Sequence, residues 1–583
     1  MKKILVLVMI TIGLSSCDFS NYILEQDYDF TTVFEKSGGT ETATYPEIID
    51  FYEDLAAVYP SIKLERIGET DSGEPLHLVT YSRNKSFDLE SLREDHSIIM
   101  INNGIHPGES DGIDATMMLF RDLAQDSISL PKNTVIAAIP VYNVGGALNR
   151  NSFSRTNQNG PKAYGFRGNA RNYDLNRDFI KADTRNTRSF YEIFHKVDPD
   201  LFIDTHVSNG ADYQYTLTHV ITQHDQMGGA LGNYIKKDLR PAVEEALKKK
   251  DWEMTPYVNV FGDVPDKGFT QFLDTPRYST GYAALWNTPG IMLETHMLKP
   301  YDKRVYGSYE FLRSMIDIAD KDIELLKKLR AQDTKAFKTK STYAFDFKVD
   351  SSKVSKLQFK GYEAERFPSE VTGFERLKYD TTRPFTKKVD YYDNFTASHE
   401  VKIPQGYIVP QAWWPILELL ELNNVKMVAF EKDTNMVVEV YRINNYETRT
   451  APYEGHYPHY NVEVESSRKK VSIKRGDFFI PIEQKAAKYL LATLEPQAPD
   501  SFFNWNFFDS ILQQKEGFSP YVFEEVAREF LDDYPEIENE FLAKKSNDPE
   551  FATNWYAQLD WIHKRSEHYE KSHLRYPVLR VSR

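Results

Sequence analysis

Residues 97–109 read Ser-Ile-Ile-Met-Ile-Asn-Asn-Gly-Ile-His-Pro-Gly-Glu, an apolar run that passes into a short polar turn. The run over Ser97–Asn103 is typical of a buried strand, and Gly112–Asp126 has apolar residues at near-helical spacing. Between them stands His106-Pro107-Gly108-Glu109, the only His-x-x-Glu in the sequence. An imidazole and a carboxylate brought together by a turn provide two of the three protein ligands of a catalytic zinc site.

Around this stretch, expected strands alternate with expected helices. Helices are predicted at Pro46–Tyr59, Thr184–Lys196 and Gly229–Lys250, and strands at Pro75–Ser82, Val135–Val141, Leu201–Thr205 and Ile291–Glu294. Such alternation, with continuously apolar strands, predicts an α/β fold with a mixed, mostly parallel sheet flanked by helices. We assign this domain to residues 45–330.

The pattern changes after Gln332–Lys340, which we interpret as a linker. Many short β-like runs predict a β-rich accessory domain over residues 341–485, interrupted by one helix at Ala412–Leu422. Periodic apolar residues then predict a helical C-terminal region over residues 486–583. The length of 583 residues suits two or three such domains. A net charge of −15 without a basic stripe argues against nucleic acid as a partner.

The beginning of the sequence has the features of an export signal. A basic Met1-Lys2-Lys3 precedes an apolar run, Ile4–Leu14, that is too short to span a bilayer. Leu14-Ser15-Ser16-Cys17 resembles a bacterial lipobox, which predicts a signal peptide over 1–17, a tether over 18–44, and a lipid anchor in the bacterial cell envelope. Cys17 is the only cysteine, so no intrachain disulfide can form and a metal site must use His, Asp or Glu.

Three groups that could bind a metal or a proton stand at comparable places in the predicted sheet. His106 and His206 each follow a buried strand, and Glu294 ends a third. Ligand sites in open α/β sheets form beyond the carboxyl ends of the strands. A fourth segment, 167–179, reads Arg-Gly-Asn-Ala-Arg-Asn-Tyr-Asp-Leu-Asn-Arg-Asp-Phe and is dense in side chains that bind anions and carbonyl groups.

In this order, the motifs resemble the M14 (carboxypeptidase A-like) family of zinc carboxypeptidases over residues 45–325. The resemblance implies one Zn²⁺ per chain and a peptide bond hydrolysed next to a free C-terminal carboxylate, by metal-activated water with Glu294 as general base. The other roles that it implies are His106, Glu109 and His206 as zinc ligands, Asp174 to orient His106, Arg167 to polarise the scissile carbonyl, and Asn176 with Arg177 to bind the substrate carboxylate. For the mobile tyrosine of the family, Tyr282 is favoured over Tyr278 because Gly281 suits a moving loop.

Two alternative functions stay open at the level of sequence. One is an amidase or peptidoglycan-stem peptidase, since an anchored envelope enzyme meets muropeptides as well as peptides with a free carboxylate. The other is an inactive envelope binding protein, which the retained ligands and Glu294 disfavour. Residues 283–288 hold no acidic side chain, which argues weakly against a pocket selective for Lys or Arg.

Overall fold

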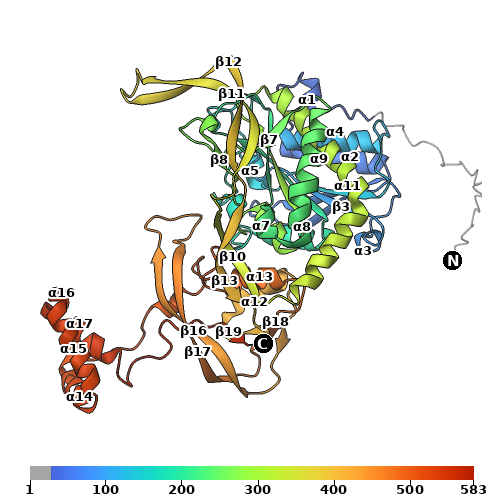
Figure 1. The fold of residues 1–583 in the computed structure, drawn as a ribbon. Helices are drawn as coiled ribbons and strands as arrows, with labels where there is room; N and C mark the ends of the chain where they lie inside the picture. The colour runs from blue at the N-terminus through green and yellow to red at the C-terminus, as the bar shows by residue number, and fades with distance from the viewer. Residues whose placement is uncertain (1–27, 583) are drawn as a thin grey trace, which may run out of the picture.

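The computed structural model describes residues 28–582, and its centre is an eight-stranded mixed sheet (Figure 1). The spatial order is β1-β2-β4-β3-β5-β9-β6-β7. The strands are β1 Ile62–Glu69, β2 Pro75–Tyr81, β3 Ser97–Asn102, β4 Thr134–Ile139, β5 Leu201–Ser208, β6 Leu217–Ile221, β7 Met254–Pro256 and β9 Gly290–His296. The four central strands β4, β3, β5 and β9 are parallel.

Helices cover both faces of this sheet because its central strands are apolar on both sides. Alternate residues of β3 point in opposite directions: Ile99 and Ile101 pack into one core cluster and Ile98 and Met100 into another. The first cluster contains α2 (Tyr45–Val58), α4 (Asp111–Ala124), α8 (Gly229–Tyr234), α9 (Arg240–Lys248) and α11 (Tyr301–Phe337), and the second contains α6 (Arg185–Val197) and α10 (Ser279–Leu285). The predicted α/β fold class is confirmed.

Two predicted connecting segments are parts of the folded body. The interpretation of Gln332–Lys340 as a linker was wrong, because α11 continues unbroken to Phe337 and the predicted boundary at residue 330 falls inside it. Of the predicted tether, residues 28–44 include the short helix α1 (Val33–Lys36), and Phe34 is fully buried against Tyr301. Residues 1–27, with the predicted signal and Cys17, lie outside the described residues.

The β-rich region consists of three small sheets. They are formed by β10 Thr342–Val349 with β13 Phe395–Lys402, by β11 Ser355–Pro368 with β12 Glu375–Tyr392 and β8 Phe269–Thr270, and by β15 Val428–Ala429, β18 Phe478–Pro481, β14 Gly406–Val409, β19 Leu579–Val581, β16 Thr434–Thr448 and β17 His459–Ile473. Because β8 belongs to the first region and pairs with β12, the two regions are joined by main-chain hydrogen bonds. They also share one hydrophobic core, which runs from Ile67 to Val578.

The C-terminal region divides into parts with different neighbours. The helix α13 (Ala487–Leu494) packs into the shared core, as does α12 (Trp414–Leu422) of the β-rich region. Four further helices form a separate lobe at the end of a stalk (Figure 1): α14 Pro520–Asp533, α15 Pro535–Asn547, α16 Pro549–Thr553 and α17 Trp555–His563. The lobe has its own small core around Phe523, Leu531 and Ile562. Among residues 28–582, no helix combines the length and apolar character needed to cross a bilayer.

Candidate metal centre and its cavity

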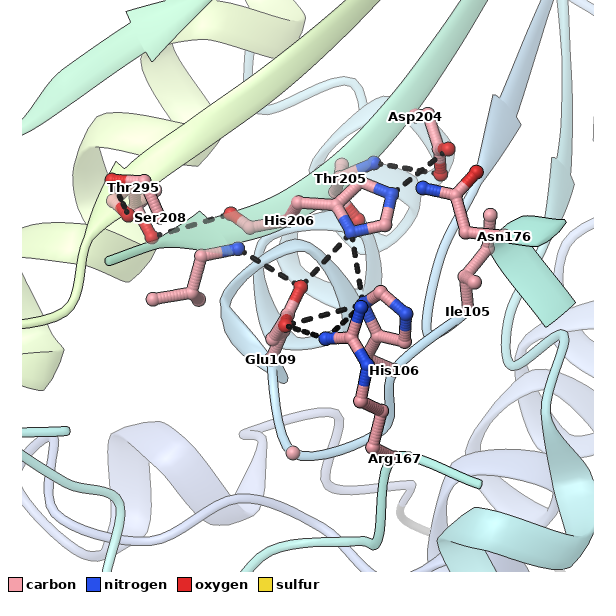
Figure 2. Close-up of polar contacts among 12 residues, drawn as sticks. Ile105, His106, Glu109, Arg167, Asn176, Asp204, Thr205, His206, Ser208 and Thr295 are labelled. Carbon is pink, nitrogen blue, oxygen red and sulfur yellow. Dashed lines mark hydrogen bonds and ion pairs between the residues drawn. The ribbon is translucent and has the colours of Figure 1, made fainter. Parts of the chain in front are cut away.

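Three buried side chains converge at the carboxyl ends of β3 and β5 (Figure 2). His106 and Glu109 come from the turn between β3 and α4, and His206 comes from β5. Their ligand atoms lie within 4.8 Å of one another. Nδ1 of His206 is 2.9 Å from Glu109 Oε2 and 3.3 Å from His106 Nδ1, which is 3.2 Å from Glu109 Oε1. Two imidazole nitrogens and a carboxylate in this arrangement are a donor set that suits a metal ion.

The far side of each imidazole ring is held by a carboxylate. Nε2 of His106 is 2.9 Å from Asp174 Oδ1, and Nε2 of His206 is 2.9 Å from Asp204 Oδ2. A carboxylate on Nε2 fixes the proton there and leaves the lone pair of Nδ1 directed into the cluster. Asp174 was expected from the sequence. Asp204 was not, although it stands two residues before His206 and therefore shares one face of β5.

The charges in the cluster compensate one another. Burial alone would raise the pKa of Glu109, but His106 and Arg155 hold it well below the ordinary value. Burial would lower the pKa of His206, but Asp204 and Glu109 raise it well above the ordinary value. Arg155 donates to Glu109 Oε1 at 2.7 Å. It lies in the loop after α5 (Val144–Leu148), where no sequence pattern pointed to it.

Glu294 stands beside the cluster because of strand register. β5 and β9 pair in parallel with His206 opposite Glu294. Within the part of the chain that the structure describes, its buried Oε2 has no hydrogen-bond partner. Burial raises the pKa of Glu294 to about 8; His206 opposes the increase, and Glu109 and Asp204 add to it. A carboxyl group in this environment can take up and release a proton near neutral pH.

Two arginines face the cavity from the polar segment found in the sequence. Arg167, about half exposed, donates through Nη2 to Asp174 Oδ2 at 2.8 Å, and its Nη1 lies 3.8 Å from Glu109 Oε1. Arg177 belongs to the short 3-10 helix η1 (Leu175–Arg177), which the side chain of Asp174 caps. Its guanidinium lies over the Tyr278 ring, 4.5 Å from the centroid. The neighbouring Asn176 accepts from the Ser279 amide at 3.2 Å.

The placement of Tyr282 corrects the expectation that it lines the site. Its side chain is fully buried, its ring stacks on Tyr191, and its hydroxyl donates to Asn423 at 2.7 Å. The reason is that α10 begins at Ser279, so Tyr282 lies in the first turn of a helix that faces the core. Glycine at position 281 allows the backbone to pack closely against Thr275, since a Cβ there would lie 2.1 Å from the Thr275 carbonyl oxygen. Tyr278, just before the helix, lines the cavity instead.

The His-Glu-His cluster, Glu294 and the two arginines border one cavity of about 280 Å³. Its wall combines the metal-cluster residues with Glu294 and with the polar and apolar side chains Arg167, Asn176, Arg177, Val220, Tyr257, Phe272, Asp274, Tyr278 and Met292. Asp274 is 3% exposed, and its Oδ1 has no partner among residues 28–582. Burial raises the pKa of Asp274 to about 7, although Arg177 opposes this. An acidic residue does therefore border the cavity, upstream of the segment 283–288 in which the sequence showed none.

Known proteins resemble this chain in sequence and, over part of its length, in structure. Carboxypeptidase 2 from Trichophyton rubrum is 22% identical over 443 residues, covering 72% of this chain and 76% of that protein. Carboxypeptidase 2 from Trichophyton equinum is 21% identical over 457 residues, covering 74% and 78%. A metallo-carboxypeptidase structure from Burkholderia cenocepacia matches with a TM-score of 0.36 and 16% identity, covering 48% of this chain and 70% of that one. No protein-family model matches the sequence.

Proposed function

We propose that this protein is a zinc metallocarboxypeptidase, which hydrolyses the peptide bond next to a free C-terminal carboxylate. One observation carries the proposal: a single cavity is bordered by the His-Glu-His cluster, by Glu294 and by Arg177 beside Asn176. Oε2 of Glu294 has no hydrogen-bond partner among the described residues. The sequence similarity to proteins named carboxypeptidase 2 supports the same reaction class.

The donor set fits zinc. His106, Glu109 and His206 offer two nitrogen ligands and one oxygen ligand, as in catalytic zinc sites with three protein ligands. The carboxylates on both Nε2 atoms fix the ring orientations that such a site needs. Zinc bound there would act as a Lewis acid toward the substrate carbonyl and would make water a stronger nucleophile.

The side chains divide the remaining work. Glu294 accepts a proton from the attacking water and passes it to the leaving amine, because it lies beside the cluster and its Oε2 has no hydrogen-bond partner among the described residues. Arg167 stabilises the oxyanion that develops on the scissile carbonyl. Arg177, supported by Asn176, holds the terminal carboxylate by charge-assisted hydrogen bonds.

The cavity also suggests which C-terminal residue is preferred. Asp274 is buried and its Oδ1 has no partner within the described part of the chain, so a cationic side chain entering the cavity would satisfy it. Val220, Phe272 and Met292 offer an apolar wall for the aliphatic stem of such a side chain. The proposed substrate is therefore a peptide that ends in a basic residue.

We also propose that the protein is exported and anchored in the cell envelope by a lipid on Cys17. The motif Leu14-Ser15-Ser16-Cys17 is the support for it. Mass spectrometry of the membrane fraction would show a mature N-terminus at a lipid-modified Cys17. An N-terminus at an unmodified Met1 would rule out the anchor.

The decisive experiment combines metal content with turnover. Protein starting near residue 20 should contain one zinc per chain and release the terminal residue from N-blocked dipeptides, with loss of activity on chelation. The panel should contain muropeptides and γ-glutamyl amides, which test the alternative amidase function. Glu294→Gln should retain zinc and lose turnover by a factor of at least about 100. Stoichiometric zinc without turnover on any substrate would contradict the proposal.

A further inference from the structure

We propose that the loop over residues 449–458, between β16 and β17 of the β-rich region, belongs to the active site. Its Tyr453 and Glu454 act as positioning residues for the groups that bind the substrate carboxylate and orient the metal cluster. This inference rests on the proposed function and adds to it a set of residues outside the α/β region.

Tyr453 holds the arginine proposed to bind substrate. Nε of Arg177 donates to the Tyr453 hydroxyl at 3.0 Å, and Nη1 of Arg177 donates to the Asn176 carbonyl at 2.9 Å. The Tyr278 ring lies under the guanidinium, 4.5 Å away. None of the described residues accepts a hydrogen bond from Nη2 of Arg177, which is therefore free to bind a substrate oxygen. Arginine has high rotamer entropy, so fixing its side chain beforehand lowers the cost of binding.

Glu454 holds the carboxylate behind the metal cluster. Its Oε2 accepts from the Asp174 amide at 2.8 Å. The Asp174 side chain in turn contacts Nε2 of His106 at 2.9 Å and Nη2 of Arg167 at 2.8 Å. A displacement of the Asp174 backbone would therefore reorient both His106 and Arg167.

The loop is docked by further close contacts. His456 Nε2 lies 2.7 Å from Asp183 Oδ2, next to the same polar segment. Gly455 has φ +79°, and a Cβ there would lie 2.6 Å from the Tyr173 hydroxyl, so the approach requires glycine.

A neighbouring segment of the C-terminal region holds the other side of the carboxylate site. Nε of Arg277 donates to Asp500 Oδ1 at 2.6 Å, and the Arg277 guanidinium lies over the Trp505 ring at 4.9 Å. Arg277 precedes Tyr278, so the ring beneath Arg177 is fixed from this side as well. Both segments that form the carboxylate site are thus tied to residues of the C-terminal half.

Binding measurements in the full chain test the inference without turnover. In a Glu294→Gln background, the probes are an N-blocked dipeptide with a free C-terminal carboxylate and its C-terminal amide, titrated by calorimetry. Adding Tyr453→Phe should weaken binding of the free acid roughly 3- to 10-fold, because one hydrogen bond to a charged group is lost, and should leave the amide unchanged. Tyr457→Phe is the matched control, since Tyr457 lies in the same loop and is 51% exposed.

A second pair of variants reads out the metal. Glu454→Leu should release zinc to a competing chelator several-fold faster than the parent, and Glu454→Gln, which keeps an oxygen acceptor for the Asp174 amide, should restore the parental rate. Thermal unfolding of all four variants shows whether each keeps the stability of the parent protein.

The outcomes separate the two proposals. If the parent protein binds acid and amide equally, the proposed function fails. If the parent prefers the acid and neither Tyr453→Phe nor Glu454→Leu differs from it, the function stands and the role of the loop is overturned. An equal loss of acid and amide binding in Tyr453→Phe would likewise overturn positioning of Arg177.

Discussion

At the scale of single residues, the metal cluster depends on groups that do not enter it. Asp174 and Asp204 each face the outer nitrogen of one histidine at 2.9 Å. Asp204 is held in turn by Ser279, whose hydroxyl donates to Oδ2 at 2.5 Å. The orientation and basicity of the two imidazole rings are therefore set by residues that do not belong to the His-Glu-His cluster.

Asp204→Asn should weaken zinc binding about 10- to 100-fold, because the amide cannot match the charge of the carboxylate on His206. Competition with a coloured chelator measures this. Asp212→Asn is a suitable control, since Asp212 pairs with His296 and Lys299 outside the cluster. Equal zinc affinity of the Asp204 variant and the parent would show that the carboxylate has no influence on the metal.

Activity should fall as the pH is lowered. Burial raises the pKa of Glu294 to about 8, from an ordinary 4.5, and a bound cation will bring it below 8. Only the carboxylate form accepts a proton, so kcat/KM should increase with pH through an apparent pKa between these two values. A pH series on one dipeptide checks this, and a profile that is flat from about pH 5 to pH 8 would contradict it.

Asp274→Asn should change side-chain preference. Removing the charge should lower kcat/KM for a C-terminal lysine about ten-fold relative to leucine, because the buried counter-charge is lost. Asp263→Asn, at a partly exposed position that does not line the cavity, should leave the ratio unchanged. A preference for leucine already in the parent protein would refute the assignment of Asp274.

At the scale of elements, the site follows from strand order and from one close helix contact. β3, β5 and β9 are adjacent and parallel, so the groups at or just after their carboxyl ends meet at one edge. Gly112, in the first turn of α4, lies against β5: a Cβ there would be 2.1 Å from Thr205 Oγ1 and 2.4 Å from its Cβ. This contact sets the distance between Glu109, just before α4, and His206.

Gly112→Ala should therefore push α4 away from β5. We expect a loss of about 1–3 kcal/mol of stability from overpacking, together with weaker zinc binding. Denaturant unfolding and chelator competition measure the two effects. Gly517→Ala is the control, because a Cβ at Gly517 would meet no atom of residues 28–582 within 4 Å. Unchanged stability and metal affinity in the Gly112 variant would show that the helix can adjust.

The sequence predicted the elements with a strong period and missed those determined by tertiary contacts. β3, β5 and β9 are continuous apolar runs, and they brought His106, His206 and Glu294 to one edge as expected. The sequence did not predict β6 and β7. The end of α11, over residues 332–337, was interpreted as a linker because most of its residues are polar and exposed. Gly281 could equally have marked a moving loop or a close backbone contact, so the choice between Tyr282 and Tyr278 needed the start of α10.

At the scale of the whole molecule, the α/β region and most of the C-terminal half form one body, while the helical lobe stands apart. The shared core joins residues from Ile67 to Val578. The lobe returns close to its starting point, since the amides of Lys515 and Glu516 both donate to Glu570 Oε2, at 2.6 and 2.9 Å. The predicted division into 341–485 and 486–583 therefore does not follow the packing.

Replacing residues 518–568 with a short Gly-Ser linker should leave zinc content and the main melting transition unchanged, because the lobe has its own core. Calorimetry and metal analysis of the shortened chain test this. As a comparison, Arg580→Ala should destabilise the body by several kcal/mol, since it leaves the buried Glu495 without its ion-pair partner. A large loss of stability on removing the lobe would mean that it supports the body.

The pairing of β19 with β14 and β16 has a consequence for synthesis. The sheet that carries the loop over 449–458 gains this strand only when residues 579–581 emerge from the ribosome. Tyr453 and Glu454 are themselves translated 276 and 280 residues after Arg177 and Asp174, the residues that they contact. The cavity therefore acquires all of its supporting contacts only after the β-rich region has been translated.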